Sequence, residues 1–422
     1  MTRLEVPLLQ TFDEYESNVR YYCRRWPALF VTSLGSTIVD DRATEYLDFF
    51  AGAGALSYGH NNPVLIEVAI EHLRAGKILH SLDTYTVEKR RFLEVMQRVI
   101  LAPRQLDMVI QTVGPTGATA VEAALQLARR VSEGKAVVGF AGGYHGMTQR
   151  TASISASLAN RTTTVPASDF VALPFVEHAT EADLSLLDQT LGSAINGERI
   201  GAVIIESTQG EGGARPFDPS FLTALRERCT DLGIVVIADE VQAGVGRTGP
   251  FFSFEGSGLD PDIVCVSKSI SGLGLPMAVN LVRRDLDVWT PGEFTGTFRG
   301  NNLAFATSAT MLETYWSDET LEKGTGLRGV IVRDALERIA AVHGGGEFIV
   351  RGNGLLCGID VRDTQLAATI ADAAFDRHLI VETCGADATT IKLLPPLVIG
   401  EDELADGLER LSDAVTFACQ SR

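Results

Sequence analysis

The sequence predicts an α/β protein whose large domain contains a mostly parallel sheet flanked by helices, together with a smaller α/β domain. Short apolar runs rich in β-branched residues alternate with amphipathic stretches, as in parallel strands that are connected by helices. Charged side chains directly follow several of these runs. The chain has 422 residues, of which 45% are hydrophobic, so it is long enough for two or three domains of roughly 150 residues each.

Three apolar runs predict buried strands, at residues 202–205, 234–237 and 263–266. Each run is too short for a helix and is rich in valine and isoleucine, which is typical of strands buried on both faces. A fourth short run at 137–140 has the same character. These runs are the expected strands of the parallel sheet.

Three stretches predict helices. In residues 117–130, Val121, Ala124, Leu125 and Ala128 recur at helical spacing and form one apolar face. Residues 401–419 have a similar leucine-rich face, and three acidic residues at the start suit the positive end of a helix. Residues 303–336 are expected to be mainly helical, with an interruption at Gly324 and Gly326.

These elements suggest a division into three parts. Residues 61–310 form the expected large α/β domain, and residues 311–422 form the smaller C-terminal domain. Residues 1–60 contain few apolar runs of their own, so we expect this N-terminal segment to pack on the smaller domain.

Composition excludes several classes of function. A formal net charge of −18 disfavours binding to nucleic acid or to an anionic membrane surface. No apolar run approaches the roughly 20 residues that a membrane helix needs, and the acidic N-terminus does not resemble a signal peptide. Six scattered cysteines without a CxxC pair and seven dispersed histidines predict a cytoplasmic protein with reduced thiols and no metal site.

Reactive side chains follow the three clearest strands. Glu206 follows the first, Asp239 and Glu240 follow the second, and Lys268 follows the third. The carboxyl ends of parallel strands meet at one edge of a sheet, where ligands bind. A lysine can form a Schiff base with the aldehyde of pyridoxal phosphate, and an aspartate can keep the pyridine nitrogen protonated. An arbitrary lysine is far more commonly a solvated loop residue, so neighbouring motifs must support this interpretation.

One such motif is an expected anion site at residues 112–117, which lead directly into the predicted helix. Free N–H groups at a helix N-terminus attract phosphate. Gly117 would let the backbone come close to the phosphate, and Thr116 would add a hydroxyl donor. An ordinary capped helix start would look the same. Tyr144, His145 and Gly146 follow the run at 137–140, where an aromatic ring could lie against a cofactor or simply pack.

Residues 244–249 match GxGxxG, the pattern of a dinucleotide-binding loop. That pattern requires a helix immediately afterwards, whereas Pro250 and three closely spaced phenylalanines follow here. We therefore reject a nicotinamide-binding function.

Taken together, the motifs resemble the class III pyridoxal-phosphate aminotransferases of fold type I over nearly the whole chain. The matching segments are 48–52 (DFFAG), 59–63 (GHNNP), 116–117 with 122–124, 144–146 (YHG), 206–213 (ESTQGEGG), 238–244 (ADEVQAG), 267–269 (SKS) and 297–301 (TFRGN). Within this class, segments 49–54, 264–277 and 296–302 are most similar to diaminobutyrate–2-oxoglutarate aminotransferases of ectoine synthesis. The resemblance implies transfer of the 4-amino group between diaminobutyrate and 2-oxoglutarate by a ping-pong aldimine mechanism, on amino acid and 2-oxo acid substrates.

The resemblance also implies roles for individual residues. Lys268 would bind the cofactor covalently and move a proton, while Asp239 would pair with the pyridinium. Val241 and Tyr144 would lie on opposite ring faces, and Gln242 would bond the ring hydroxyl. The full implied cofactor site is Thr116, Gly117, Ala118, Tyr144, His145, Glu206, Asp239, Val241, Gln242, Lys268 and Thr297. Because Thr297 would reach the phosphate of a neighbouring subunit, a homodimer or higher homo-oligomer is expected.

Two positions depart from the class. Lys392 stands where many relatives have an arginine that binds the substrate carboxylate, and lysine cannot form the same bidentate contact. Arg299 stands where many relatives have a small residue, and we expect it to bind a substrate carboxylate across a dimer interface, with an interface salt bridge as the alternative. Glu206 would be the gating acid that pairs with the carboxylate-binding cation.

Two other functions stay open from the sequence. A class III aminotransferase could use another diamine or ω-amino acid, or the chain could be an aminomutase on the same fold. Glu240 and Val241 match the general class III pattern more closely than they match the pattern of the ectoine enzymes. This difference favours a function in a specialised pathway. A non-catalytic relative is disfavoured because Lys268, Asp239 and Gln242 are all present.

Overall fold

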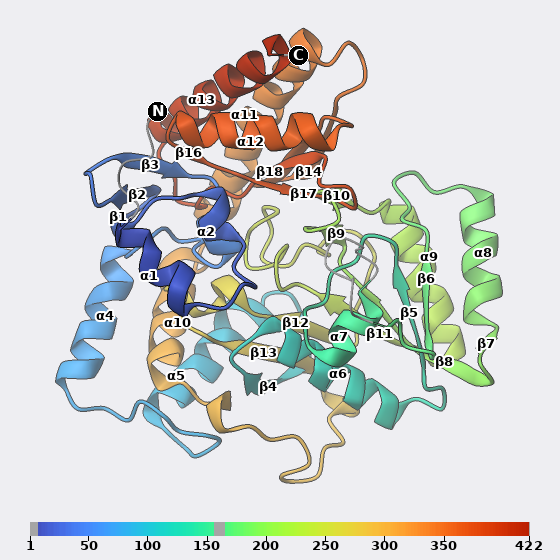
Figure 1. Cartoon of the computed structure of the whole chain (residues 1–422). Coiled ribbons are helices and arrows are strands. Elements are labelled where there is room, and N and C mark those ends of the chain that lie inside the picture. Colours follow the sequence, from blue (N-terminus) through green and yellow to red (C-terminus); the bar gives the residue numbers. More distant parts are fainter. Residues whose placement is uncertain (1–6, 156–164, 422) are drawn as a thin grey trace.

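The computed structural model describes residues 7–155 and 165–421 (Figure 1). A large central sheet has the strand order β4-β13-β12-β11-β8-β5-β6, and β7 pairs with β8 at its side. The bounds are β4 (Met108–Gly114), β5 (Ala136–Phe140), β6 (Phe170–Leu173), β7 (Ala194–Ile195), β8 (Glu198–Ile205), β11 (Val235–Asp239), β12 (Ile263–Val266) and β13 (Ala278–Arg283).

The pairing confirms a mostly parallel sheet. Strands β12, β11, β8, β5 and β6 are parallel along the sheet, and β13 is antiparallel to both of its neighbours. The predicted runs at 137–140, 202–205 and 263–266 all lie in strands, and the run at 234–237 contributes all but its first residue to β11. The carboxyl ends of β8, β11 and β12 therefore lie next to one another.

Both faces of this sheet are buried. In β11, Val235 and Ile237 pack in the cluster formed with α6 (Gly117–Val131), whereas Val236 and Ala238 belong to the core on the opposite face. This alternation explains the continuous apolar runs, because a strand covered by helices on both sides has no solvent-facing residues. The remaining helices of this region are α4 (Pro63–Arg74), α5 (Val87–Val95), α7 (Gln149–Ile154), α8 (Glu181–Leu191), α9 (Pro219–Leu232) and α10 (Asn302–Tyr315).

A second sheet lies near the C-terminus. Its antiparallel strands have the order β14-β15-β18-β17, and helices α11, α12 and α13 lie above them in Figure 1. The bounds are α11 (Thr320–His343), β14 (Ile349–Asn353), β15 (Leu356–Asp360), α12 (Thr364–Asp376), β17 (Glu382–Cys384), β18 (Thr390–Leu393) and α13 (Glu401–Gln420). A short ribbon, β9 (Thr208–Gln209) with β10 (Arg215–Pro216), lies between β8 and α9 in sequence, and β10 contacts β14 of the C-terminal sheet.

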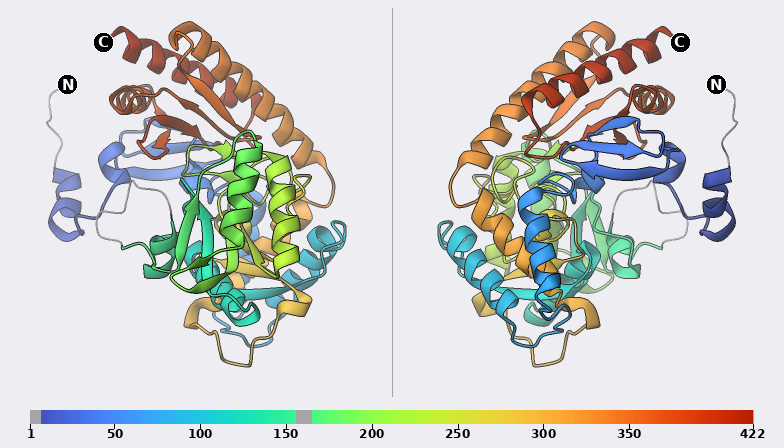
Figure 2. Two further views of the ribbon diagram at one scale, coloured as in Figure 1. Left: turned by 90° about the vertical axis from the view of Figure 1, so that its right-hand side faces the viewer. Right: turned by 90° about the vertical axis from the view of Figure 1, so that its left-hand side faces the viewer.

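The N-terminal segment joins the C-terminal region through backbone hydrogen bonds. Strand β3 (Glu45–Asp48) pairs in parallel with β16 (Leu379–Ile380), in the sheet order β1-β2-β3-β16. The other elements here are α1 (Pro7–Tyr15), α2 (Tyr22–Arg25), β1 (Phe30–Leu34), β2 (Thr37–Asp40) and α3 (Ala51–Gly54), and α1 projects from the side of the molecule in Figure 2. The three-part division at residues 60 and 310 stays a proposal, and residue 310 falls inside α10.

The expected helical interruption at Gly324 and Gly326 is wrong. Helix α11 runs through both glycines, and the break lies at residues 316–319. A glycine costs a helix about 1 kcal/mol relative to alanine, and the burial of Leu321 and Val332 on this helix offsets that cost. The predicted helices at 117–130 and 401–419 are confirmed as α6 and α13.

The segment at 244–249 has a structural function instead of a nucleotide-binding one. No helix follows it, and the fully buried Arg247 connects distant parts of the chain. Its guanidinium donates to the carbonyl oxygens of Leu355 at 3.2 Å and Pro395 at 2.5 Å, and to Ser57 Oγ at 2.9 Å. Burial lowers the pKa of Arg247 to about 10, so it stays charged at neutral pH.

Among the residues that the structure describes, no helix has both the length and the apolar character needed to cross a bilayer.

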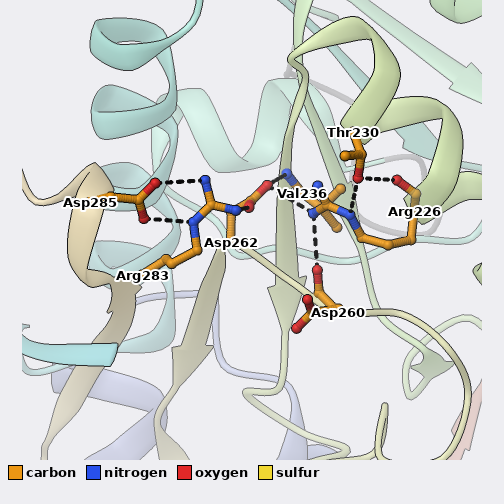
Figure 3. A network of polar contacts seen from close by, with 7 residues as sticks. All are labelled: Arg226, Thr230, Val236, Asp260, Asp262, Arg283 and Asp285. Carbon is orange, nitrogen blue, oxygen red and sulfur yellow. Dashed lines mark hydrogen bonds and ion pairs between the residues drawn. The ribbon is translucent and has the colours of Figure 1, made fainter. Parts of the chain in front are cut away.

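A buried ion pair fixes the amino ends of the central strands (Figure 3). Asp262, which precedes β12, accepts hydrogen bonds from Val236 N at 2.8 Å and from Arg226 Nη1 at 3.0 Å. Its other oxygen accepts from Arg283 Nη1 at 2.5 Å, and Arg283 also pairs with the exposed Asp285 at 2.7 Å. One carboxylate therefore links β11, β12, β13 and α9.

We predict that Asp262→Ala lowers the free energy of unfolding by about 3 kcal/mol, because it leaves a buried N–H and two arginines without their shared partner. Asp285→Ala is the control. It removes an exposed partner of the same arginine and should cost no more than about 1 kcal/mol. Urea denaturation measures both, and equal losses would contradict the prediction.

Candidate active site

A cavity of about 740 Å³ lies at the carboxyl ends of β8, β11 and β12. Most of the site residues predicted from the sequence line it, namely Thr116, Gly117, Ala118, Tyr144, His145, Glu206, Asp239, Val241, Gln242 and Lys268. The parallel pairing explains this convergence, since Ile205, Asp239 and Val266 end neighbouring strands. Residues far apart in sequence thus share one wall.

Asp239 is held in place by two hydrogen bonds. Its Oδ2 lies 2.8 Å from His145 Nδ1, and its Oδ1 accepts from Val241 N at 3.1 Å. Both Asp239 and His145 are 4% exposed. His145 is itself fixed, because its backbone N donates to Ser155 Oγ at 2.9 Å. The carboxylate therefore has one orientation toward the cavity.

Lys268 opens a short 3₁₀ turn directly after β12, with a left-handed φ of 51°. Only a few per cent of non-glycine residues adopt such a φ, and they concentrate at functional sites. Burial lowers the pKa of the Lys268 amine, although the negative charge of Glu211 acts in the opposite direction. A lysine with a lowered pKa is more often neutral, which makes its amine a better nucleophile.

Glu206 lies against the backbone at the cavity wall. Its Oε2 accepts from Tyr144 N at 3.0 Å and its Oε1 from Gly210 N at 3.2 Å. Burial raises the pKa of Glu206 to about 7, since the opposing effect of His145 is smaller and Asp239 adds repulsion. Glu206 can therefore carry a proton near neutral pH.

The N-terminus of α6 forms another part of the wall. Thr116 is its N-cap and accepts from Thr119 N through Oγ1 at 3.4 Å. The first N–H groups of a helix have no intrahelical acceptor, so those of Gly117 and Ala118 suit an anion. A Cβ at Gly117 would lie 2.6 Å from Val241 Cγ1, which shows why this position has to be glycine.

Two predicted residues lie away from the cavity. Thr297 and Arg299 belong to the 3₁₀ turn Thr297–Arg299 and do not contribute to its lining. Arg299 Nη1 donates to Phe294 O at 3.0 Å and lies 3.8 Å from Asp83 Oδ2. Their proposed roles require a second subunit.

Lys392 lies behind the cavity wall, and its partner differs from the one expected. Its Nζ lies 2.6 Å from Glu211 Oε1 and 3.0 Å from Glu382 Oε1, and donates to Gln242 Oε1 at 3.1 Å. Glu206 does not contact this cation here, because both of its oxygens accept backbone N–H groups instead. Its gating role stays a prediction. Burial opposes the charge of Lys392, but the two carboxylates outweigh it and raise its pKa well above the usual value.

The sequence interpretation missed Glu211 and Glu382. Glu211 stands among glycines five residues after Glu206, and an acidic residue in such a loop was a usable signal. Glu382 gave none, because it meets Lys392 only through the cross-strand register of β17 and β18. Contacts of this kind depend on strand pairing, which a local pattern does not reveal.

The geometry supports one kind of chemistry. A nucleophilic amine, a fixed carboxylate–imidazole pair and an anion-binding helix end all face one cavity. This arrangement suits a cofactor that carries an anionic group, a ring nitrogen and an aldehyde.

We predict a pH signature for Glu240, which is fully buried beside Asp239 and accepts from Ser253 N at 2.7 Å. Burial raises its pKa from 4.5 to about 8. Between these values the unfolded chain releases a proton that the folded chain keeps, so rising pH destabilises the protein. The difference in the free energy of unfolding between wild type and Glu240→Gln should therefore change with pH. It should become about 2–4 kcal/mol less favourable to wild type from pH 5 to pH 8 and then level off.

Urea unfolding at pH 5, 6.5, 8 and 9 tests this, with the exposed Glu71→Gln as control. A relative stability that does not change with pH would show that Glu240 ionises normally in the folded protein.

Comparison with known proteins identifies the family. Residues 22–415 match the family profile described as Aminotransferase class-III. A Nocardia farcinica protein named diaminobutyrate–2-oxoglutarate transaminase is 45% identical over 412 residues, which cover 97% of this chain and 94% of the relative. A Streptomyces anulatus protein of the same name is 44% identical over 415 residues, covering 97% and 98%.

Solved structures confirm the predicted fold type I architecture. The ornithine aminotransferase of Toxoplasma gondii has a TM-score of 0.84 at 25% identity, covering 100% of this chain and 97% of that chain. The acetylornithine aminotransferase of Elizabethkingia anophelis has a TM-score of 0.80 at 25% identity, covering 99% and 100%. The chain therefore belongs to the class III aminotransferases.

Proposed function

We propose that this chain is a pyridoxal-phosphate-dependent aminotransferase that acts on L-2,4-diaminobutyrate and 2-oxoglutarate. The 4-amino group moves to the oxo acid, giving aspartate 4-semialdehyde and glutamate, and the reaction is reversible. The observation that carries the proposal is the convergence of Lys268 and the Asp239–His145 pair on one cavity. The substrate pair is supported by the relatives at 44–45% identity.

The residues present fit pyridoxal 5′-phosphate. The N-terminus of α6 offers N–H groups and a helix dipole for the phosphate, and Asp239 offers a carboxylate for the ring nitrogen. Val241 and Tyr144 offer apolar surface for the ring, and Gln242 an amide for its hydroxyl. When bound, the cofactor supplies an aldehyde carbon and a ring that accepts electrons.

The chain supplies the positioning and the proton transfer. Lys268 would provide the amine that holds the cofactor, and the same amine would serve as the base that moves a proton at the reacting carbon. Its lowered pKa suits both tasks, because a base works best when its pKa is close to the working pH. Asp239, fixed by His145 and the backbone, offers its carboxyl group where a ring proton has to be retained.

The first experiment is a half-reaction spectrum of the purified holoenzyme. We predict that diaminobutyrate and glutamate each bleach the band of the enzyme-bound aldehyde, whereas ornithine and 4-aminobutyrate do so at least about 10-fold more slowly, a difference of about 1.4 kcal/mol. Lys268→Ala is the control and should lack the band that depends on the lysine.

If another amine reacts fastest, the enzyme is an aminotransferase or aminomutase with a different donor. If wild type shows no band after cofactor is added, the role of Lys268 is wrong. The cytoplasmic location and a place in ectoine synthesis remain predictions that this experiment does not address.

We also propose a homodimer. Exposed apolar side chains cluster near the turn that contains Thr297 and Arg299, including Phe298 (68% exposed), Ile78 (59%) and Tyr85 (104%). His80, which lies between Ile78 and Tyr85 in sequence, contacts the turn directly. It forms a β-bridge with Asn301, and its ring meets the edge of the Phe298 ring with the centroids 5.7 Å apart. Contiguous apolar surface of this kind usually marks a protein interface, and a partner there would account for the outward position of Thr297.

We predict that wild type has a solution mass near twice 45.3 kDa and that Phe298→Glu shifts it toward one chain with loss of activity. A buried charge at an interface is costly without a partner. Val342→Glu introduces the same charge on an exposed part of α11 and should leave the mass unchanged. Light scattering after gel filtration measures both, and a monomeric wild type would overturn the proposal.

A further inference from the structure

The cavity presents a carboxylate, and the cation behind it is enclosed. Lys392 is 0% exposed and Glu382 is 6% exposed, whereas the Glu211 side chain is 28% exposed. Glu211 lines the cavity, and neither Lys392 nor Glu382 does. A substrate that enters the cavity therefore meets Glu211 before it can reach Lys392.

Lys392 is held from two sides. Glu382 stands opposite Lys392 in the β17–β18 register, so the backbone pairing fixes their 3.0 Å contact. Glu211 approaches from the loop after β8 at 2.6 Å. Even if Glu211 moved away, Lys392 would keep a carboxylate partner, which makes it a poor anchor for a substrate carboxylate.

The orientation of Glu211 leaves one oxygen for a ligand. Its Oε1 accepts both from Lys392 Nζ at 2.6 Å and from Gln242 Nε2 at 3.0 Å. Within the described residues, no hydrogen bond engages Oε2. Burial opposes ionisation of Glu211, but the charges of Lys392 and Lys268 outweigh it and lower its pKa to about 2. The group stays a carboxylate at every physiological pH.

A diamine has the complementary chemistry. In diaminobutyrate the amine at carbon 4 reacts, and the other amine is a second ammonium next to the carboxylate. 4-Aminobutyrate has the same chain and carboxylate without that ammonium. An ammonium–carboxylate hydrogen bond is among the stronger polar contacts in proteins, so one carboxylate can separate these two donors.

We propose that Glu211 binds the second ammonium of a diamine donor, and that Lys392 and Glu382 are positioning residues that hold Glu211 in place. This inference rests on the proposed function and extends it to the residue that selects the donor. It also reassigns Lys392, which the resemblance implied as a direct substrate ligand.

The test compares the two donors in single-turnover half-reactions of the holoenzyme, giving a limiting rate and an apparent Kd for each. In Glu211→Gln, the preference for diaminobutyrate over 4-aminobutyrate should fall about 10- to 100-fold. Glu409→Gln, an exposed change of the same charge on α13, should keep the wild-type preference. An unchanged preference in Glu211→Gln, or an equal loss for both donors, would overturn the inference.

A binding measurement gives a readout without turnover. In a Lys268→Ala background, calorimetry should show that Glu211→Gln weakens diaminobutyrate binding relative to 4-aminobutyrate binding by a similar factor. Glu211→Asp keeps the charge and should retain part of the preference, which covers the case that the glutamine variant folds poorly. Equal affinities of the parent and Glu211→Gln for diaminobutyrate would count against the contact.

The positioning role of Glu382 has its own signature. Glu382→Gln leaves Lys392 to pair more closely with Glu211, so the apparent Kd for diaminobutyrate should rise about 3- to 10-fold at an unchanged limiting rate. A fall in limiting rate for both donors would instead indicate general damage. If wild type reacts with neither donor, the proposed function fails; if wild type prefers diaminobutyrate and Glu211→Gln keeps that preference, only this inference fails.

Discussion

The parallel pairing of β8, β11 and β12 is the constraint on which the site depends. Ile205 lies beside Ala238, and Asp239 lies beside Cys265, so the residues that follow these strands emerge side by side. Asp262 secures the opposite ends of β11 and β12 through Val236 and two arginines (Figure 3). A shift of one residue in this register would turn the side chain of Asp239 to the other face of the sheet.

The site concentrates buried charge, and several of the charged groups have a partner. Asp239 is paired with His145, Lys392 with Glu211 and Glu382, and Arg247 with carbonyl groups from the C-terminal region. Burial disfavours the charged form of such groups, and for Lys392 the two carboxylates outweigh this effect. Arg247 contacts Leu355 and Pro395, and Lys392 of β18 contacts Glu211 and Gln242. Both cations therefore connect the central-sheet region with the C-terminal region.

The sequence was most informative where strands and motifs are local. Short β-branched runs predicted β5, β8, β11 and β12, and the residues after them predicted most of the cavity wall. Contacts made through pairing of distant elements could not be predicted in this way. Glu382 meets Lys392 only because β17 and β18 are paired in one register, and Glu211, rather than Glu206, reaches that lysine because Glu206 is bound to the backbone. The continuity of α11 through two glycines likewise depends on tertiary packing, which outweighs local propensity.

The pairing of β3 with β16 has a consequence for how the protein is made. Residues 45–48 find their parallel partner only at residues 379–380, which are synthesised much later. Throughout synthesis the nascent N-terminal sheet has an open edge at β3, and open edges recruit other strands. Contacts this distant in sequence also form slowly. A chain released before residue 379 is made would thus have an exposed edge that favours aggregation, so the short strand β16 protects a strand that lies far upstream of it in the sequence.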